Sequence, residues 1–367
     1  MHGREHHALK DLLDESDLAL VDALQVNPRA SWTTIGQALE ISPMTASRRW
    51  QKLTDSGSAW ATVALGDRGM RGAVLEMSVR PGAAMKVATE LAHIPCVITV
   101  GVTSGRFQVF ALILGPSLRE VSSFLAEGFI PPDEVTDLHS YLFDGFYGGV
   151  VWRLGIMNQT KTALIDNSAA HVSQLTEGRP LGPTDRRLFL ALGQDGRRTF
   201  NDLAAELGST AYSVRRRLDR LSRRGDIVFR CDLARPLAGW NSMALVWLRA
   251  PDREVETIGR TLGALPETRH CSAVVGPSNL VLIVSLRSLE HMADLRERIG
   301  QMFPGLEIVD RRIILRQVKI HGRLLDESGR SVKVVPVDPW SLEFGPDIEE
   351  RGGLSHDDRD GSSKVYL

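Results

Sequence analysis

The chain has 367 residues, of which 43% are hydrophobic and 24% charged, and its formal net charge at pH 7 is −1. This length favours more than one domain, and the composition excludes a disordered or fibrous chain. The near-zero charge also excludes a general polycation, so any affinity for nucleic acid must come from local charge. The three cysteines lie far apart and form no CxxC pair, which favours buried thiols over a disulfide framework or a zinc site.

The N-terminal segment is polar, and we expect residues 1–12 to form a flexible arm. It contains His2, His6 and His7, but no complete set of metal ligands accompanies them, so we expect neither a metal nor a cofactor. No apolar run approaches the roughly 18 residues of a membrane span, and no secretory signal is visible. We therefore expect a cytoplasmic chain without a membrane partner.

Three helices are expected in residues 13–57. The first begins at Asp14 or Ser16 and ends at Asn27-Pro28, because a residue before proline is disfavoured in the α region. The second carries an apolar face built on Ile35. The third begins at Ser42-Pro43, which combines an N-cap residue with proline at the first helical position, and it ends near Gly57.

This helical unit occurs twice, at an offset of 168 residues without a gap. Apolar, charged and turn positions repeat together, which indicates a duplication. The matched pairs include Asp17 and Asp185, Leu20 and Leu188, Arg29 and Arg197, Arg48 and Arg216, Arg49 and Arg217, and Gly57 and Gly225. In the second copy the third helix is expected to begin near Ala211.

A strand and an α/β segment are expected after each helical unit. The strands are 60–65 and 227–233. The first α/β segment then reads as strands 73–79, 97–102, 107–114 and 135–143 with helices 83–92 and 118–127. The second reads as strands 242–249, 271–275, 280–286 and 306–318 with helices 252–265 and 289–303. This βαββαβ order is the ferredoxin-like pattern.

The expected fold class is α+β, with two winged helix-turn-helix domains alternating with two ferredoxin-like domains. The domain boundaries are an arm at 1–12, helix-turn-helix domains at 13–65 and 181–233, ferredoxin-like domains at 70–150 and 238–320, a linker with a helix at 151–180, and a mostly flexible tail at 321–367. Within the tail, residues 332–340 are apolar enough to pack or pair. Within the linker, Ile156, Thr160, Ala163 and Leu164 suggest the helix, and residues 177–180 look like a hinge.

A helix-turn-helix unit reads DNA through the N-terminal side chains of its third helix, while flanking cations contact phosphates. In the second copy the expected base-facing residues are Tyr212, Ser213, Arg215 and Arg216. The residues expected to reach phosphates or to cover the flank of the helix are Arg217, Arg220, Arg223 and Arg224. In the first copy the candidates are Thr45, Ser47, Arg48, Arg49 and Lys52. The alternative is that residues 215–224 form only a solvated helix face paired with Asp219.

The two copies differ in charge. Residues 181–230 hold eleven arginines and six acidic residues, a net charge of +5, whereas residues 13–60 hold four basic and six acidic residues, a net charge of −2. Because phosphate contacts dominate affinity, we expect the second copy to be the stronger DNA reader.

Over about residues 13–320 the chain resembles the Lrp/AsnC transcription regulators, in their double-length form. The resemblance is carried by Leu13-Asp14-x-x-Asp17, Ile41-Ser42-Pro43 before Arg48-Arg49, the counterpart Arg215-Arg216-Arg217-Leu218, Gly276-x-x-Asn279-Leu280 and Pro304-Gly305-Leu306. It implies a sequence-specific regulator of transcription that binds double-stranded DNA, forms homo-oligomers and responds to a small effector such as an amino acid.

The resemblance implies that an amino acid binds between dimers in higher oligomers, and Gly276, Ser278 and Asn279 in the central turn of the sensor domain are the candidate effector residues. The alternative is that this turn only connects two strands of a hairpin. The chain departs from the family at Gly208-Ser209-Thr210-Ala211, where a Ser-Pro start is usual, and at Ser104-Gly105-Arg106-Phe107-Gln108, the turn of the first sensor copy. Two fused copies suggest that one chain mimics a family dimer, with its two sensor sheets packed together and unequal DNA half-sites.

Two other functions remain open at this point. Siroheme decarboxylases resemble the same family, but their Arg-Arg-Phe-Gly run is absent, and Phe229-Arg230-Cys231-Asp232-Leu233 stands in its place. No Walker loop, GxGxxG or HExxH motif occurs, so we expect the chain not to be an enzyme. The third possibility is a ligand-sensing scaffold whose helix-turn-helix units do not bind DNA.

Overall fold

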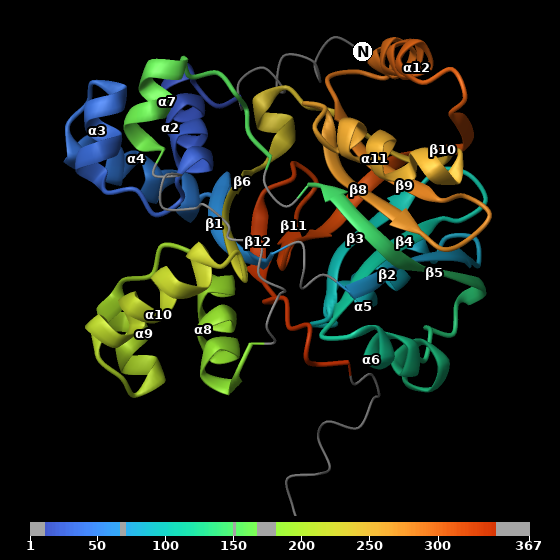
Figure 1. The fold of residues 1–367 in the computed structure, drawn as a ribbon, viewed down its shortest axis with the longest axis horizontal. Coiled ribbons are helices and arrows are strands. Elements are labelled where there is room, and N and C mark those ends of the chain that lie inside the picture. Colours follow the sequence, from blue (N-terminus) through green and yellow to red (C-terminus); the bar gives the residue numbers. More distant parts are fainter. Residues whose placement is uncertain (1–11, 67–70, 150–151, 167–180, 343–367) are drawn as a thin grey trace, which may run out of the picture.

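The computed structural model describes residues 12–66, 71–149, 152–166 and 181–342. Two helical units lie one above the other, and a body of strands and helices lies beside them (Figure 1). Nearly all of the expected arm, the expected hinge at 177–180 and residues 343–367 fall outside the described residues. Among those described, no helix is long and apolar enough to cross a membrane.

The first unit contains the three expected helices, α2 (Glu15–Val26), α3 (Trp32–Leu39) and α4 (Pro43–Asp55). Each begins at a residue whose side-chain oxygen accepts a hydrogen bond from the backbone N–H three positions later: Asp14, Ser31 and Ser42. The predicted start at Ser42-Pro43 is therefore confirmed, with the proline in the first turn.

The second unit repeats this arrangement in α8 (Pro183–Gln194), α9 (Phe200–Leu207) and α10 (Ala211–Arg223). The expected start of the third helix near Ala211 is confirmed. Thr210 replaces the serine of the first copy as N-cap and accepts a hydrogen bond from the Ser213 N–H at 3.2 Å. The departure from Ser-Pro therefore leaves the helix properly capped.

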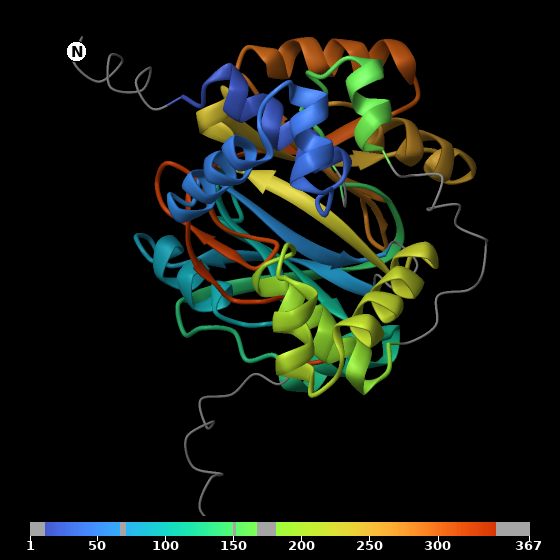
Figure 2. The same cartoon turned by 90° about the vertical axis from the view of Figure 1, so that its left-hand side faces the viewer.

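The strands that follow the two units, β1 (Ala59–Leu65) and β6 (Ile227–Leu233), pair with each other in antiparallel fashion. Ala59 pairs with Leu233, and Leu65 pairs with Ile227. At the offset of 168 residues Leu233 is the counterpart of Leu65 and Ile227 is the counterpart of Ala59, so the pairing is symmetric. The expected wing strand of each unit therefore pairs across the two copies. A pseudo-two-fold axis therefore passes between Thr62 and its counterpart Arg230, which are paired with each other. Figure 2 shows this pair between the two helical units.

Both α/β segments have the predicted βαββαβ order. The first contains β2 (Arg71–Val79), α5 (Ala84–Ala92), β3 (Val97–Thr103), β4 (Val109–Gly115), α6 (Leu118–Ser123), which continues as a π-helical turn at Phe124–Gly128, and β5 (Val135–Gly148). The second contains β7 (Ser242–Arg249), α11 (Val255–Gly263), β8 (Thr268–Val274), β9 (Leu280–Leu286), α12 (His291–Met302) and β10 (Glu307–Ile320).

The two sensor sheets join into one closed barrel through their longest strands. The first part of β5 pairs with β2 and its last part with β8, while the first part of β10 pairs with β7 and its last part with β3. Side chains from both sheets fill the interior, among them Phe110, Leu112, Trp247 and Ile283. The expectation that the two sheets pack together is confirmed.

The segment after β10 is ordered, so the prediction of a flexible tail from residue 321 is wrong as far as residue 342. Two short strands, β11 (Arg323–Leu325) and β12 (Ser331–Val334), extend the sheet beside β10. The buried Arg323 guanidinium donates to the Gln194 carbonyl at 2.6 Å, and the Trp340 ring lies edge-on to Phe189 with centroids 5.6 Å apart. The polar stretch that suggested disorder is the hairpin turn, in which Asp326 accepts the Ser328 and Arg330 N–H groups.

The expected linker helix is present as α7 (Gln159–Ile165). Ile156 and Leu164 are exposed, and Ile165 is the buried residue of the helix. The buried Asp22 carboxylate accepts the N–H groups of Gly155, Ile156 and Met157 and so fixes how the linker meets α2.

Candidate nucleic-acid interface

The third helix of the second unit has one buried and one exposed face. Val214, Leu218 and Leu221 point into the core of the unit. The opposite face exposes Tyr212 and a run of cationic side chains: Arg215, Arg216, Arg220 and Arg223. An exposed third helix of this kind has the shape and charge that major-groove binding requires.

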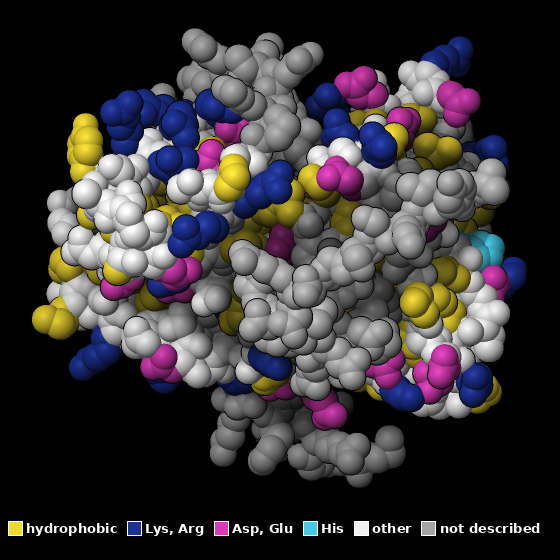
Figure 3. Space-filling view, turned by 90° about the horizontal axis from the view of Figure 1, so that it is seen from below, with side chains coloured by type: hydrophobic (Ala, Val, Ile, Leu, Met, Phe, Trp, Pro, Cys, Tyr) yellow, Lys and Arg dark blue, Asp and Glu magenta, His cyan; other side chains and the backbone are white. Residues whose placement is uncertain are grey.

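Arg215 and Arg216 are the most available of these cations. Among the residues described, neither has an ion-pair partner, whereas Arg220 lies 3.6 Å from Asp185. Tyr212, at the start of the helix, has 74% of its surface exposed. In Figure 3 lysine and arginine side chains gather on the side of the molecule that carries this unit.

Arg217 and Arg49 occupy a different position from their neighbours and face the first helix of their own unit. Arg217 forms an ion pair with Asp185 at 2.6 Å, and Arg49 forms the equivalent pair with Asp17 at 2.8 Å. The hydrogen bonds that Arg49 donates to Asp17 and Asp14 raise its pKa. Their ion pairs hold the third helix against the first, and the predicted contact of Arg49 and Arg217 with DNA stays a prediction.

Thr45 and Ser213 are likewise engaged within their helices. Thr45 lies 2.8 Å from the hydroxyl of its N-cap Ser42, and Ser213 lies 3.0 Å from that of Thr210. Both are therefore part of the helix start, where a groove-bound helix comes nearest to the bases, and each hydroxyl keeps further hydrogen-bonding capacity.

The exposed face of α4 is less basic than that of α10. Arg48 and Lys52 are exposed and Ser47 is half-buried, while Asp55 stands where the second unit has Arg223. Met44, with 78% of its surface exposed, occupies the position of Tyr212. The charge difference expected from the whole segments thus remains when only exposed third-helix side chains are compared.

Arg29 and Arg197 connect the two units, a function that the repeat pattern did not reveal. Arg29 donates to the carbonyls of Gly196 and Arg198 at 2.6 and 3.0 Å, and Arg197 donates to those of Pro28 and Ala30 at 2.5 and 3.0 Å. Burial lowers the pKa of Arg197 to about 10. These cations therefore belong to the junction and not to a DNA-facing surface.

The three expected effector residues lie in the turn between β8 and β9. Ser278 is buried and Gly276 is exposed beside Tyr141. The Asn279 amide is occupied by the backbone of Ala250, accepting its N–H and donating to its carbonyl, both at 2.8 Å. Gln108 forms the matching bond to the Val79 N–H in the first copy, at 3.0 Å. Asn279 therefore anchors the turn in this structure.

The described residues contain no group of three His, Cys, Asp or Glu side chains that is placed to hold a metal ion. Cys96, Cys231 and Cys271 are free and buried, as expected from their spacing. Burial raises the pKa of Cys96 and of Cys271 to about 12, which makes both thiols poor nucleophiles.

Comparison with protein families matches the AsnC-type helix-turn-helix domain to residues 13–54 and 183–222, and the Lrp/AsnC ligand binding domain to residues 243–324. The HTH-type transcriptional regulator Rv2324 of Mycobacterium tuberculosis is 30% identical over 121 residues, which are 32% of this chain and 82% of that protein. An uncharacterised HTH-type transcriptional regulator of Pyrococcus abyssi is 27% identical over 113 residues, 30% of this chain and 72% of that protein.

Among solved structures, the siroheme decarboxylase NirDL superposes with a TM-score of 0.53 at 15% identity, covering 86% of this chain and 96% of that one. At this identity the likeness concerns the fold, including its doubled arrangement. The two regulators named above each match about a third of this chain and most of their own length. The chain belongs to the Lrp/AsnC family of transcriptional regulators, in a double-length form whose two helix-turn-helix units occur at 13–54 and 183–222.

Proposed function

We propose that this chain is a sequence-specific DNA-binding regulator in which one polypeptide supplies both reading units, with the second unit dominant. The observation that carries the proposal is the exposed face of α10, where Arg215 and Arg216 extend from a helix held in place by the Arg217–Asp185 ion pair. Arginine at such positions recognises guanine by paired hydrogen bonds, and the neighbouring cations bind phosphates.

The unequal third helices support unequal half-sites. A symmetric homodimer presents two identical reading helices and so favours a palindromic operator. Here Tyr212 stands where the first unit has Met44, and Arg215 stands where it has Ser47. We infer an operator with one strongly specified half-site and one weakly specified half-site.

A small effector such as an amino acid remains part of the proposal, as does assembly into homo-oligomers. The family likeness of residues 243–324 to a ligand binding domain supports the first. The turn at Gly276, Ser278 and Asn279 stays a candidate contact region, although an effector there would have to compete with Ala250 for the Asn279 amide. The solution mass of the full chain tests the assembly.

Sequence-specific DNA binding can be tested by selecting sites from a random pool of DNA duplexes. Mobility-shift titrations of the selected sites at several salt concentrations then measure the affinity. We expect a recovered motif, and an affinity that falls steeply with salt because phosphate contacts release counterions. Recovery of no motif and no shift would favour the scaffold alternative. An absorbance scan of the purified chain with added iron uroporphyrin tests the decarboxylase alternative, since a solved structure of NirDL contains an iron-uroporphyrin III analogue.

A further inference from the structure

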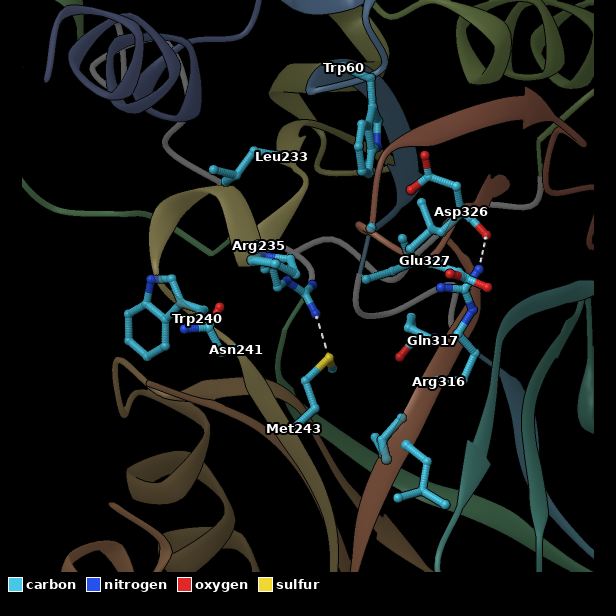
Figure 4. Close-up of a pocket in the computed structure, with 16 residues that line it drawn as sticks. Trp60, Leu233, Arg235, Trp240, Asn241, Met243, Arg316, Gln317, Asp326 and Glu327 are labelled. Carbon is cyan, nitrogen blue, oxygen red and sulfur yellow. Dashed lines mark hydrogen bonds between the residues drawn. The ribbon is translucent and has the colours of Figure 1, made fainter. Parts of the chain in front are cut away.

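A cavity of about 150 Å³ lies where the paired strands β1 and β6 meet the barrel and the C-terminal hairpin (Figure 4). Trp60 closes it from β1, Arg235 and Trp240 line it from the segment between β6 and β7, and Gln317 lines it from β10. The hairpin contributes Asp326. The cavity is therefore built from both halves of the duplicated chain, and it is separate from the turn at Gly276–Asn279.

Two buried polar atoms on the cavity wall have no protein partner. They are the indole N–H of Trp60, a residue that is 4% exposed, and the side-chain carbonyl oxygen of Gln317, and neither is hydrogen-bonded to any described part of the chain. Buried polar groups in native proteins are nearly always hydrogen-bonded, so an unpaired donor and acceptor in one cavity point to a polar occupant.

The cavity also holds a buried cation that forms no ion pair among the described residues. Arg235 is 7% exposed, and its hydrogen-bond partner among these residues is the Met243 sulfur at 3.5 Å. The carboxylate of Asp232, whose charge acts on Arg235, is paired with Arg230 at 2.7 Å. Of the two carboxylates in the cavity lining, Asp326 accepts the backbone N–H groups of its own turn and Glu327 is exposed. Burial lowers the pKa of Arg235 to about 10, so the side chain still carries its charge at neutral pH.

An adjoining smaller cavity shares Arg235, Met243 and Gln317 with the first. In it two guanidinium nitrogens of the buried Arg269 have no hydrogen bond to the described residues, and the guanidinium carbon lies 3.7 Å from the centre of the Trp152 ring. A buried cation that forms no ion pair is costly, and an anion bound between Arg235 and Arg269 would offset that cost.

We propose that this cavity binds a small organic carboxylate with an apolar body. Its carboxylate is held by Arg235 and the Trp60 indole N–H, and a hydroxyl or amino group on the ligand donates to Gln317. Trp240, Met243 and Ile314 supply the apolar wall. Arg235 and Gln317 approach the cavity from opposite sides, which sets the ligand across it (Figure 4).

Binding here would also influence DNA recognition, and this second part rests on the proposed function. The cavity wall includes Trp60 from β1 and Leu233 from the end of β6, the two strands that connect the helix-turn-helix units. A ligand that bridges these strands to Gln317 in the barrel changes how firmly the units are held to the sensor. Binding without an effect on DNA would refute only this second part.

Calorimetric titration of the full chain with phenylacetate, phenylacetamide and phenylethylamine tests the site. These three probes share the aromatic body and differ in charge. We expect phenylacetate to bind at least roughly tenfold more tightly than the amide and the amine, because a charge-assisted bond to a buried guanidinium is stronger than a neutral one. Equal binding of all three, or no binding of phenylacetate below about 10 mM, overturns the proposal.

Two variants locate the binding. Arg235→Gln should lower the affinity for phenylacetate at least roughly tenfold, while Arg253→Ala, at an exposed arginine outside the cavity, should leave it unchanged. Should Arg235→Gln fail to fold, Trp60→Phe provides the second test, since it keeps an aromatic ring and removes the unpaired donor. We expect Trp60→Phe to weaken phenylacetate binding with an unchanged melting temperature. Undiminished binding by a folded Trp60→Phe or Arg235→Gln variant contradicts the site.

Discussion

Arg29 and Arg197 are counterparts at the offset of 168 residues, and each donates two hydrogen bonds to backbone carbonyls of the other's unit. Each also lies over an aromatic ring of the other unit, Arg29 over Phe200 at 4.9 Å and Arg197 over Trp32 at 4.0 Å. This reciprocity is the signature of a two-fold interface, in which residue i meets j and j meets i. Here the interface lies within one chain.

Substitution of either arginine should therefore destabilise the junction. We expect Arg29→Lys and Arg197→Lys each to lower the free energy of unfolding by about 1–3 kcal/mol, because lysine cannot donate to two carbonyls in the fixed fork of arginine. Urea unfolding measures the loss. Since both side chains serve one junction, the double variant should lose less than the sum of the single losses. Strict additivity would contradict a shared interface.

The Arg217–Asp185 ion pair gives a prediction that separates positioning from DNA contact. If Arg217 positions α10, then Asp185→Asn should weaken DNA binding, although it removes a negative charge near the phosphates. The loss should accompany a decrease in stability of up to about 1 kcal/mol, as for a partly exposed pair. Mobility-shift titration checks the first effect and thermal unfolding the second. Tighter DNA binding by Asp185→Asn would contradict the positioning role, because it would mean that Arg217, once released from the ion pair, contacts DNA directly.

Lys319 gives a pH-dependent prediction. It is fully buried, its ammonium donates to the Ile94 carbonyl at 2.9 Å, and burial lowers its pKa to about 7. Because an unfolded lysine titrates near 10.4, the unfolded chain binds one more proton than the folded chain between about pH 7 and 10. The free energy of unfolding should then rise by about 1.4 kcal/mol per pH unit in this window from Lys319 alone.

Lys319→Met should remove that rise and be more stable than the parent chain near pH 7. The adjacent Cys96, whose pKa burial raises to about 12, stays protonated across the window and does not obscure the comparison. Urea unfolding of both proteins at pH 7, 8 and 9 gives the difference. Parallel curves would mean that Lys319 is charged in the folded state throughout.

Most secondary structure could be predicted from the sequence because the duplication doubles every signal. Ser42 and Thr210 are local N-cap residues, so their helices are readable from a few neighbouring positions. The different environments of Arg215, Arg216 and Arg217 could not be predicted from neighbouring positions, because they depend on which side of the helix faces the rest of the unit. A usable signal did exist: Asp17 and Arg49 repeat together as Asp185 and Arg217, which indicates a pair of opposite charges.

The remaining errors concern contacts between distant segments. Polar residues after position 321 resemble a tail, but Arg323 reaches the end of α8, more than a hundred residues earlier in the chain. The cavity is equally hidden, because its wall runs from Trp60 to Gly329 and no local pattern joins these positions. The barrel closes because β5 and β10 are long enough to pair with strands of both sheets. The alternation of hydrophobic residues does not predict the lengths of these two strands.

The central claim is that one chain reads DNA through two unequal units, with the second dominant. The most direct measurement is the affinity of matched variants for the selected DNA site. Arg215→Ala and Arg216→Ala should each weaken binding by about 1–3 kcal/mol, and Arg48→Ala by less, with Arg253→Ala as the exposed-arginine control. Equal losses from Arg216→Ala and Arg48→Ala, together with a footprint of two identical half-sites, would contradict the claim.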